Sequence, residues 1–277
     1  MLKQRIVTAT VLLAILLPVL VVDTPWPFAV VALAAFAVGA WEWGRLNGAG
    51  PLSFALGVAL VAMALAAIAL GWVFEAPRSA WWIAVVAWVA GGAWTLRGGT
   101  AGWPKAPRAL RLVLGLVVLW AAWLALANAK AIGLNFILSV FVVVWFADVF
   151  AYFGGRAFGR RKLAPTISPN KSWEGVWSGA VGVLAVAALW LAVERSLHVD
   201  SPSLFARLDA RFGLVGLALV VVFLVGMSVV GDLVESLVKR SAGAKDSSRL
   251  LPGHGGVLDR VDALLPVFPI ALALASL

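Results

Sequence analysis

Long runs of apolar residues, separated by short polar loops, cover most of the chain. A helix needs about 20 apolar residues to cross the hydrocarbon core of a bilayer, so each run of that length predicts a membrane span. Gly71, Pro104 and Pro252 fall at or between the ends of these runs, as helix breakers should. The predicted spans are 5–22, 26–43, 52–74, 80–96, 109–127, 131–151, 174–193, 212–230 and 261–277. The pattern predicts an all-α, polytopic integral membrane bundle of about nine transmembrane helices.

Composition agrees with a membrane protein. The chain is 63% hydrophobic and 13% charged, whereas a soluble domain has about 45–50% apolar and about 25% charged residues. It contains no cysteine, which excludes disulfides, thiolate zinc sites and cysteine nucleophiles. The first span is followed by Asp23-Thr24-Pro25 rather than by a small-residue cleavage site, so we expect a retained helix and not a signal peptide.

The basic residues predict the orientation. If the N-terminus is cytoplasmic, 17 of the 22 Lys and Arg residues fall in cytoplasmic segments. The five on the other side are Arg78, Lys130, Arg195, Arg207 and Arg211. The positive-inside rule therefore predicts a cytoplasmic N-terminus, an external C-terminus and cytoplasmic loops after the sixth and eighth spans. A net charge of +9 could indicate nucleic-acid binding, but this distribution favours the membrane surface and no nucleic acid.

The few acidic residues are concentrated. Seven of the 13 lie in two short regions that face the same predicted side: Asp148 and Glu174, then Asp232, Glu235, Asp246, Asp259 and Asp262. Hard cations such as Mg²⁺ take oxygen ligands, commonly one or two carboxylates together with substrate phosphates and water. The clustering predicts a divalent-cation site at the membrane surface, with Asp232 and Asp259 as its first candidates.

Spacing places several of these acids on common helix faces. Asp232, Glu235 and Lys239 follow an i, i+3, i+7 pattern, and Asp259 and Asp262 are three apart at the start of the last predicted helix. The simpler interpretation of Glu235 and Lys239 is an i, i+4 ion pair worth about 0.2–0.5 kcal/mol. Asp232 and Asp262 have no such explanation, because each adjoins an apolar span.

Between these acids, Pro252-Gly253-His254-Gly255-Gly256 cannot form a regular helix. Glycines permit positive φ and close backbone approach, and successive N–H groups in such a turn can bind an anion. The simpler interpretation is a tight turn. The flanking basic residues, Lys239, Arg240, Lys245, Arg249 and Arg260, favour a triphosphate-binding loop. His254 either donates to a phosphate oxygen or bonds the backbone of its own loop.

The middle region offers a second set of polar residues. Asp148 lies in an otherwise apolar helix and predicts a polar cleft, unless it forms a packing ion pair with Arg156. The Arg160–Lys162 run is either a charge anchor or a binding site for an acidic lipid headgroup. Ser172 is placed to cap the next helix, and Lys171 beside it is our preferred phosphate contact.

Two segments resemble a known family. The pattern S-x2-K-R-x4-K-D-x5-P-G-H-G-G-x2-D-R-x-D, from Ser236 to Asp262, is similar to the signature of the phosphatidate cytidylyltransferase (CDP-diacylglycerol synthase) family. So are the Gly231-Asp232-x2-Glu235 lead-in, Asp148-x3-Tyr152 and Ser168-Pro-Asn-Lys-Ser-Trp-Glu-Gly175. The resemblance covers Asp148–Gly175 and Gly231–Asp262 and departs from the family pattern at no fixed position.

The resemblance implies an enzyme of bacterial inner-membrane type that joins CTP and phosphatidate into CDP-diacylglycerol and pyrophosphate, the opening step toward anionic phospholipids. It also implies dependence on Mg²⁺, alone or with a second, monovalent cation, and often a homodimer. Residues 1–130 would then be N-terminal transmembrane helices, and residues 131–277 the catalytic transmembrane region with its cytoplasmic loops.

On this hypothesis the chemistry assigns a role to each motif residue. Asp232, Lys239, Asp259 and Asp262 would be catalytic, with the metal on Asp232, Asp259 and Asp262. The substrate-binding residues would be Asp148, Arg156, Ser168, Lys171, Glu235, Ser236, Arg240, Lys245, Asp246, His254, Gly255, Gly256 and Arg260.

Two other functions remain as alternatives. A CTP-dependent lipid kinase would use the same nucleotide, but it would need a base for a hydroxyl and would release CDP. A transporter or scaffold would explain the spans but not the acidic clusters on one side. The D-G-x2-A-R run of CDP-alcohol phosphotransferases does not occur in the sequence.

Overall fold

The computed structural model describes residues 2–277, without the side chains of Leu2, Lys3 and Arg5, so the predicted placement of Lys3 and Arg5 lies outside the described residues. The first half contains α1 (Leu2–Val21), α2 (Trp26–Leu46), η1 (Gly50–Leu52), α3 (Ser53–Ala69), α4 (Arg78–Val86), η2 (Ala87–Gly91), α5 (Gly92–Gly102), η3 (Trp103–Lys105) and α6 (Arg108–Ile132). The second half contains α7 (Leu134–Phe158), β1 (Lys162–Ala164), β2 (Ser168–Ser172), α8 (Trp173–Glu194), α9 (Leu204–Ser241), α10 (Leu258–Val261) and α11 (Leu264–Ala275).

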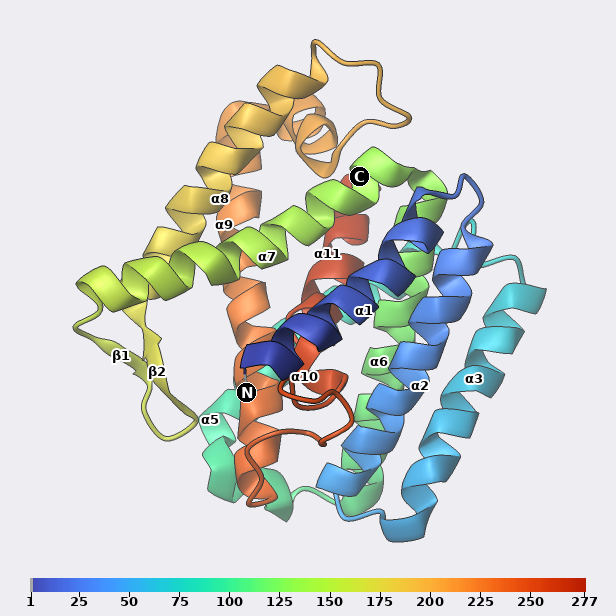
Figure 1. Cartoon of the computed structure of the whole chain (residues 1–277), viewed down its shortest axis with the longest axis vertical. Coiled ribbons are helices and arrows are strands. Elements are labelled where there is room, and N and C mark those ends of the chain that lie inside the picture. Colours follow the sequence, from blue (N-terminus) through green and yellow to red (C-terminus); the bar gives the residue numbers. More distant parts are fainter. Residues whose placement is uncertain (1) are drawn as a thin grey trace.

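The chain is a polytopic helical bundle, as the apolar runs predict (Figure 1). Among the described residues, seven helical segments are long and apolar enough to cross a membrane. They are Trp26–Leu46, Gly50–Ala69, Arg78–Lys105, Arg108–Ile132, Leu134–Phe158, Trp173–Glu194 and Leu204–Ser241. The first and last predicted spans correspond to α1 and α11, which do not meet these criteria, so the count of nine stays a prediction.

Two glycines interrupt helices that continue on both sides of them. Gly213 has φ 67° inside α9, and Gly99 has φ 60° inside α5. Positive φ is accessible to glycine at little steric cost, so each allows a sharp change of direction without ending the helical pattern. The predicted span at 212–230 therefore starts at a bend, and the residues from Leu204 to Phe212 form a separate helical segment before it.

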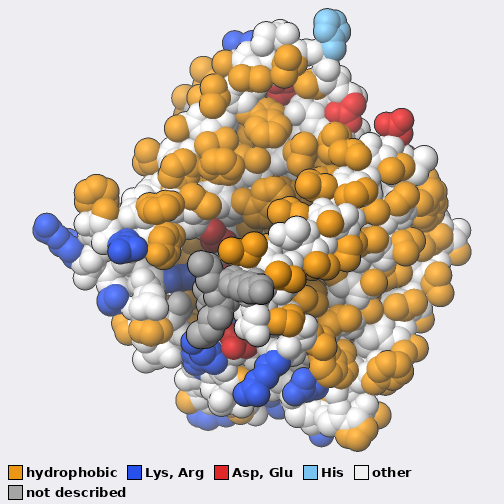
Figure 2. All heavy atoms as spheres, in the orientation of Figure 1, with side chains coloured by type: hydrophobic (Ala, Val, Ile, Leu, Met, Phe, Trp, Pro, Cys, Tyr) orange, Lys and Arg blue, Asp and Glu red, His pale blue; other side chains and the backbone are white. Residues whose placement is uncertain are grey.

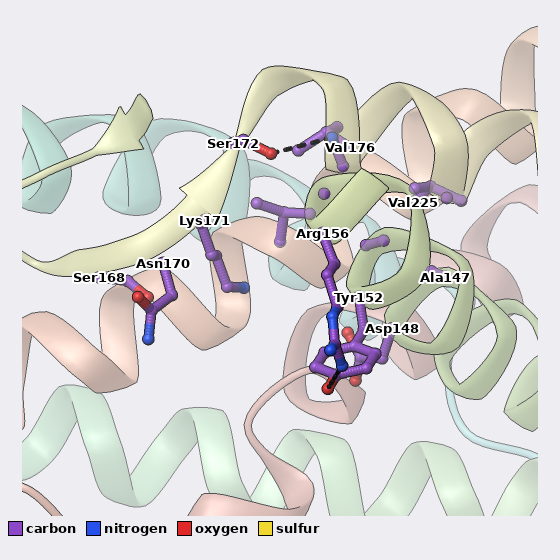
Figure 3. Close-up of a pocket in the computed structure, with 15 residues that line it drawn as sticks. Ala147, Asp148, Tyr152, Arg156, Ser168, Asn170, Lys171, Ser172, Val176 and Val225 are labelled. Carbon is purple, nitrogen blue, oxygen red and sulfur yellow. Dashed lines mark hydrogen bonds between the residues drawn. The ribbon is translucent and has the colours of Figure 1, made fainter. Parts of the chain in front are cut away.

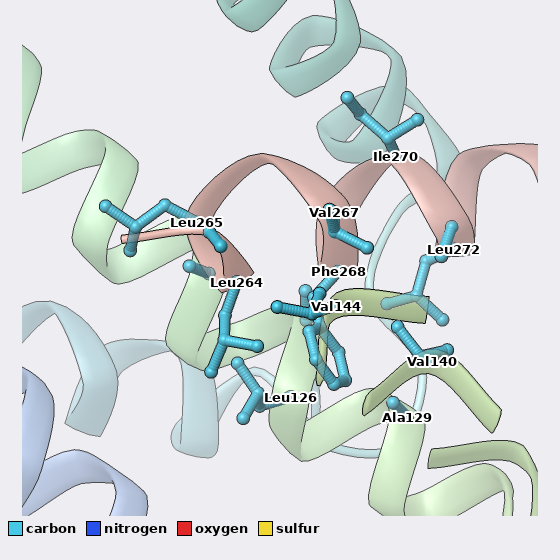
Figure 4. Close-up of a cluster of buried hydrophobic side chains, with 14 of the residues drawn as sticks. Leu126, Ala129, Val140, Val144, Leu264, Leu265, Val267, Phe268, Ile270 and Leu272 are labelled. Atoms are coloured by element: carbon cyan, nitrogen blue, oxygen red, sulfur yellow. The ribbon is translucent and has the colours of Figure 1, made fainter. Parts of the chain in front are cut away.

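The short helix α11 lies in the centre of the bundle. It packs against α4, α6, α7 and α9, and every residue from Leu264 to Ala273 is buried. Its side chains interlock with those of α6 and α7, as Figure 4 shows. A ring pair fixes one of these contacts, since Phe268 lies 4.9 Å from Phe141 between ring centroids. A helix that is apolar on all sides is expected in such a buried position.

The polar loops gather at one end of the bundle. The β1–β2 hairpin and the loop after α9 lie at the lower end in Figure 1, whereas the α8–α9 loop and the C-terminus lie at the upper end. Most Lys and Arg side chains on the face in Figure 2 are at the lower end as well. The hydroxyl of Thr8 on α1 donates to the Pro252 carbonyl at 2.9 Å. Which end faces the cytoplasm stays a prediction.

The packing of α11 can be tested by removing its largest ring. We expect Phe268→Ala to lower the free energy of unfolding by about 3–5 kcal/mol, because it leaves a cavity in the centre of the bundle. Thermal unfolding in detergent measures this loss. Leu219→Ala is the matched control, since Leu219 is 68% exposed. Equal stability of the two variants would contradict a central position for α11.

Candidate functional site

A cavity of about 520 Å³ lies between α7, α8, α9 and β2. Its polar lining consists of Asp148, Tyr152 and Arg156 from α7 together with Ser168, Asn170, Lys171 and Ser172 from β2. Arg156 extends along one face of α7 to Tyr152 and Asp148, and Lys171 lies across the cavity from them on β2 (Figure 3). The remaining walls are apolar or small: Ala147, Ala151, Gly155, Gly175, Val176, Gly179, Val225 and Val229. The cavity is therefore amphipathic, with charge at one side and hydrocarbon at the other.

Small residues hold the two helices of this cavity close together. A Cβ atom on Gly175 would lie 2.9 Å from the Ala151 carbonyl oxygen, and one on Gly179 would lie 2.9 Å from that of Ala147. Such contacts between small residues are a usual way for membrane helices to pack. Ser172 caps α8 as predicted, because its hydroxyl accepts from the Gly175 N–H at 3.2 Å. The cap and the glycines together fix β2 over the end of α7.

Arg156 and Asp148 do not form the packing ion pair that was the alternative for Asp148. Arg156 donates to the Tyr152 hydroxyl at 3.4 Å, and the described residues include no ion pair of Asp148. The carboxylate of Asp148 is exposed to the cavity, close enough to Lys171, Asp232 and Arg260 for their charges to interact. The predicted polar cleft at Asp148 is present.

An ion pair joins the two motif regions. The ammonium of Lys171, on β2, lies 2.5 Å from Asp232 Oδ2, on α9. The other oxygen, Asp232 Oδ1, accepts from the Ser236 hydroxyl at 3.2 Å. Segments about 60 residues apart in the sequence thus meet at one pair of half-buried charges. Asp232 lies at the end of the cavity that carries Lys171.

A second group of charges surrounds Lys239. Its ammonium lies 2.6 Å from Glu235 Oε2 and 2.5 Å from Asp259 Oδ1. The i, i+4 pair of the simpler interpretation is present, but it is no surface pair, because the Glu235 side chain is only 2% exposed. Glu235 Oε1 is buried without a partner among the described residues. Two carboxyl groups thus contact one ammonium.

Asp259 is already bound on both oxygens. Lys239 contacts Oδ1, while Oδ2 accepts from the Gly256 N–H at 2.7 Å, the Ser247 N–H at 2.9 Å and the Ser247 hydroxyl at 2.8 Å. Burial raises the pKa of Asp259, but the hydrogen bonds from Lys239, Gly256 and Ser247 outweigh it and hold the pKa below its usual value. Asp259 is thus a charged organiser of the loop in this structure.

Asp262 lies against α9, close to Asp232. Its carbonyl oxygen packs against Gly231, where a Cβ atom would meet it, and its charge interacts with those of Asp232 and Asp148. Asp259 belongs to the four-residue helix α10 and Asp262 ends it, which corrects the prediction that both start the last long helix. The described residues contain no group of three or more His, Cys, Asp or Glu arranged to hold a metal.

The loop at Pro252–Gly256 is irregular, as predicted. Gly253 and Gly255 have φ values of 77° and 82°, and Leu251 pairs with Gly255 in an isolated bridge. A Cβ atom on Gly255 would lie 2.7 Å from Asp259 Oδ2, so this glycine admits a carboxylate of the protein itself. His254 donates its backbone N–H to the Leu251 carbonyl at 2.8 Å, while its Nδ1 is buried without a partner among the described residues.

The predicted basic group is divided. Lys245 and Arg249, with Asp246 and with Arg45 from α2, line a separate polar hollow of about 690 Å³. Arg260 lies near Asp148 on the side of the first cavity. Arg240 binds two carbonyls, those of Ile167 at 3.4 Å and Ala244 at 3.1 Å, and so joins the hairpin loop to the end of α9. This division corrects the prediction that all five basic residues form one phosphate-binding site.

Glu174 and Glu42 have roles that the motifs do not reveal. Glu174 accepts from the Arg160 and Arg161 N–H groups at 3.0 and 3.1 Å. It therefore stabilises the loop before β1 and does not join the other acids. Glu42, on α2, is fully buried and binds the loop after α9. A carboxylate inside the apolar run 26–43 costs as much as one inside 131–151, so the argument applied to Asp148 could have found it.

Comparison with known proteins finds relatives of this sequence over nearly its whole length. The model of the family described as "Cytidylyltransferase family" matches residues 3–277. The chain belongs to the cytidylyltransferase family.

Relatives that cover nearly the whole chain carry a common name. A protein named phosphatidate cytidylyltransferase from Pseudomonas aeruginosa is 43% identical over 286 residues, covering 99% of this chain and 97% of the relative. One of the same name from Haemophilus influenzae is 37% identical, covering 97% and 96%. A Bacillus subtilis protein of that name is 39% identical over 155 residues, covering 56% and 52%. The family resemblance of the two motif regions thus extends to the N-terminal helices.

The geometry at Asp259 predicts a structural cost for its substitution. We expect Asp259→Asn to lower the free energy of unfolding by about 1–3 kcal/mol, because an amide nitrogen would face N–H donors and Lys239 would lose one anionic partner. Thermal unfolding in detergent measures the difference. Asp246→Asn is the control, since Asp246 is exposed. An Asp259→Asn variant as stable as the control would show that the loop does not depend on this carboxylate.

Proposed function

We propose that this protein is a phosphatidate cytidylyltransferase, which transfers the cytidylyl group of CTP to phosphatidate and forms CDP-diacylglycerol and pyrophosphate. The observation that carries the proposal is the amphipathic cavity at which Lys171 and Asp232 meet. The shared name of relatives that cover the whole chain supports it. The reaction would take place at the cytoplasmic face of a bacterial-type inner membrane, as the opening step of phospholipid synthesis.

The cavity suits a lipid with a phosphate headgroup. Lys171 and Arg156 would bind the phosphate oxygens, and Ser168 and Asn170 offer further donors beside them. The apolar walls from α7, α8 and α9 would then lie along the glycerol and the first carbons of the acyl chains. Lys171 is paired with Asp232 in this structure. Its ammonium would therefore move from the Asp232 carboxylate to the phosphate of the lipid when the lipid binds.

The carboxylates at this end fit a hard cation in part. Asp232, Asp262 and Asp148 lie close enough for their charges to interact, and their oxygens are donors of the kind that Mg²⁺ prefers. Asp259 fits less well, because both of its oxygens are bound by protein donors. We therefore propose that Asp232 and Asp262 bind the ion and that Asp259 holds the loop in place. When bound, Mg²⁺ would neutralise charge on the CTP phosphates.

The reaction needs positioning more than covalent chemistry from the protein. A phosphatidate oxygen would attack the α-phosphorus of CTP in line, forming one P–O bond while the bond to the β-phosphate breaks and pyrophosphate leaves. A phosphate dianion is already a nucleophile, so no general base is required. Lys239 and Arg260 would stabilise the charge on the triphosphate. Assembly as a homodimer stays a prediction.

Labelled CTP distinguishes this reaction from its main rival. Purified protein would be incubated with Mg²⁺, CTP labelled at either the α- or the γ-phosphorus, and either phosphatidate or a long-chain lipid alcohol. The transferase places the α-label in the lipid and releases the γ-label as pyrophosphate, and a chelator stops the reaction. A CTP-dependent kinase places the γ-label in the lipid and releases CDP. Transfer of the γ-label, or of neither label, contradicts the proposal.

Lys171 provides a test of the lipid site. We expect Lys171→Gln to lower kcat/KM for phosphatidate on the order of 100-fold, because a charge-assisted hydrogen bond to the headgroup is lost. Steady-state kinetics with phosphatidate in mixed micelles measures the change. Lys105→Gln is the matched control, since Lys105 lies in η3, outside the cavity, with an exposed side chain. Equal losses in both variants would indicate a general effect of surface charge.

A further inference from the structure

Glu42 is a fully buried carboxylate that binds a segment more than 200 residues away in the sequence. Its Oε1 accepts from the Ser248 hydroxyl at 2.5 Å and the Val257 N–H at 3.0 Å. Its Oε2 accepts from the Ser247 hydroxyl at 3.0 Å and the Leu258 N–H at 2.7 Å. Each oxygen thus receives one hydroxyl and one backbone N–H, and four donors replace the water that a carboxylate loses on burial.

These contacts fix both ends of one loop. Ser247 and Ser248 lie shortly after α9, and Val257 and Leu258 lie at the start of α10. The Gly-rich turn at Pro252–Gly256 is the part between them. A carboxylate from α2 therefore pins the ends of the segment from Ser247 to Leu258 to a transmembrane helix, while the turn projects from it.

The loop is shaped to admit this carboxylate. A Cβ atom on Gly256 would collide with Glu42 Oε1 and with the Ser247 hydroxyl. The second glycine of the Gly-Gly pair thus leaves room for Glu42. This steric requirement explains a glycine at position 256 without any contact with a phosphate.

Ser247 connects Glu42 to the charged group around Lys239. Its hydroxyl oxygen lies 3.0 Å from Glu42 Oε2 and 2.8 Å from Asp259 Oδ2. One hydroxyl proton can serve only one of these oxygens at a time, so the two carboxylates share it. Asp259 in turn holds Lys239 at 2.5 Å. A continuous polar chain therefore runs from α2 through the loop to α9.

We propose that Glu42 is a positioning residue for the nucleotide, which holds the segment Ser247–Leu258 so that Lys239, Asp259 and the Gly-rich turn face the triphosphate together. The inference rests on the proposed function. Glu42 itself contacts no substrate on this account. Its effect should appear in the binding of CTP and not in the binding of phosphatidate, whose cavity lies beyond α9 and is lined by none of these loop residues.

The informative substitution is Glu42→Gln. It preserves size but turns an NH₂ group toward two of the four donors. A serine hydroxyl can rotate to accept from it, whereas the N–H of Val257 or Leu258 cannot. Glu194→Gln is the matched control, because Glu194, at the end of α8, accepts from the N–H and hydroxyl of Ser203 before α9 and from Asn135 on α7. Glu42→Asp retains the charge on a shorter side chain and should recover part of the function.

Two measurements on the full-length protein test the inference. In hydrogen exchange, we expect the amides of Val257 and Leu258 to exchange about tenfold faster in Glu42→Gln than in the wild type, and to be unchanged in Glu194→Gln. In kinetics, we expect Glu42→Gln to raise the KM for CTP about tenfold, with the KM for phosphatidate within about twofold of the wild type and partial rescue in Glu42→Asp.

Either of two results would overturn the inference: unchanged exchange of the loop amides in Glu42→Gln, or equal rises in KM for both substrates matching those of Glu194→Gln. The two proposals fail in different ways. A wild-type protein that transfers no cytidylyl group refutes the proposed function, whereas exchange of the loop amides reports on the Glu42 contacts whether or not the protein turns over.

Discussion

A charge placed inside an apolar body must be met by an opposite charge or by hydrogen-bond donors, and this constraint decides how the loops of this protein fold. Asp232 is met by Lys171, Asp259 by Lys239 and two N–H groups, and Glu42 by the Ser248 hydroxyl and two N–H groups, while Asp259 and Glu42 share the Ser247 hydroxyl. Removing one partner of a buried pair leaves an uncompensated charge, which is strongly destabilising. The polar contacts therefore hold the motif loops to the helices.

The apolar helices alone would not specify this arrangement. Hydrocarbon contacts among α6, α7, α9 and α11 build the bundle, but side chains of similar shape could pack in other registers. The Lys171–Asp232 pair joins β2 to α9, beside a cavity that has charge at one side and hydrocarbon at the other. An enzyme that joins a water-soluble nucleotide to a membrane lipid needs such a surface, since each substrate comes from a different solvent.

Much of this could be predicted from the sequence, and the failures have physical causes. Apolar length predicts the helices, and the Ser172 cap and the irregular turn at Pro252–Gly256 follow from local chemistry. Sequence spacing does not tell on which side of a loop a flexible basic side chain lies, so it cannot separate Lys245 and Arg249, which line one hollow, from Arg260, which lies near Asp148. Glu42 was missed because its partners are over 200 residues away, and only its position inside an apolar helix marks it.

The most direct test of the account is whether β2 and α9 meet at Lys171 and Asp232. The natural chain has no cysteine, so a Lys171→Cys, Asp232→Cys variant can be treated in membranes with a short thiol-specific cross-linker, digested, and examined by mass spectrometry. The account predicts an intramolecular cross-link between the two peptides and none in an Arg195→Cys, Asp232→Cys variant, whose first position lies at the opposite end of α8. Absence of the 171–232 link, with both cysteines shown to be reactive, would contradict it.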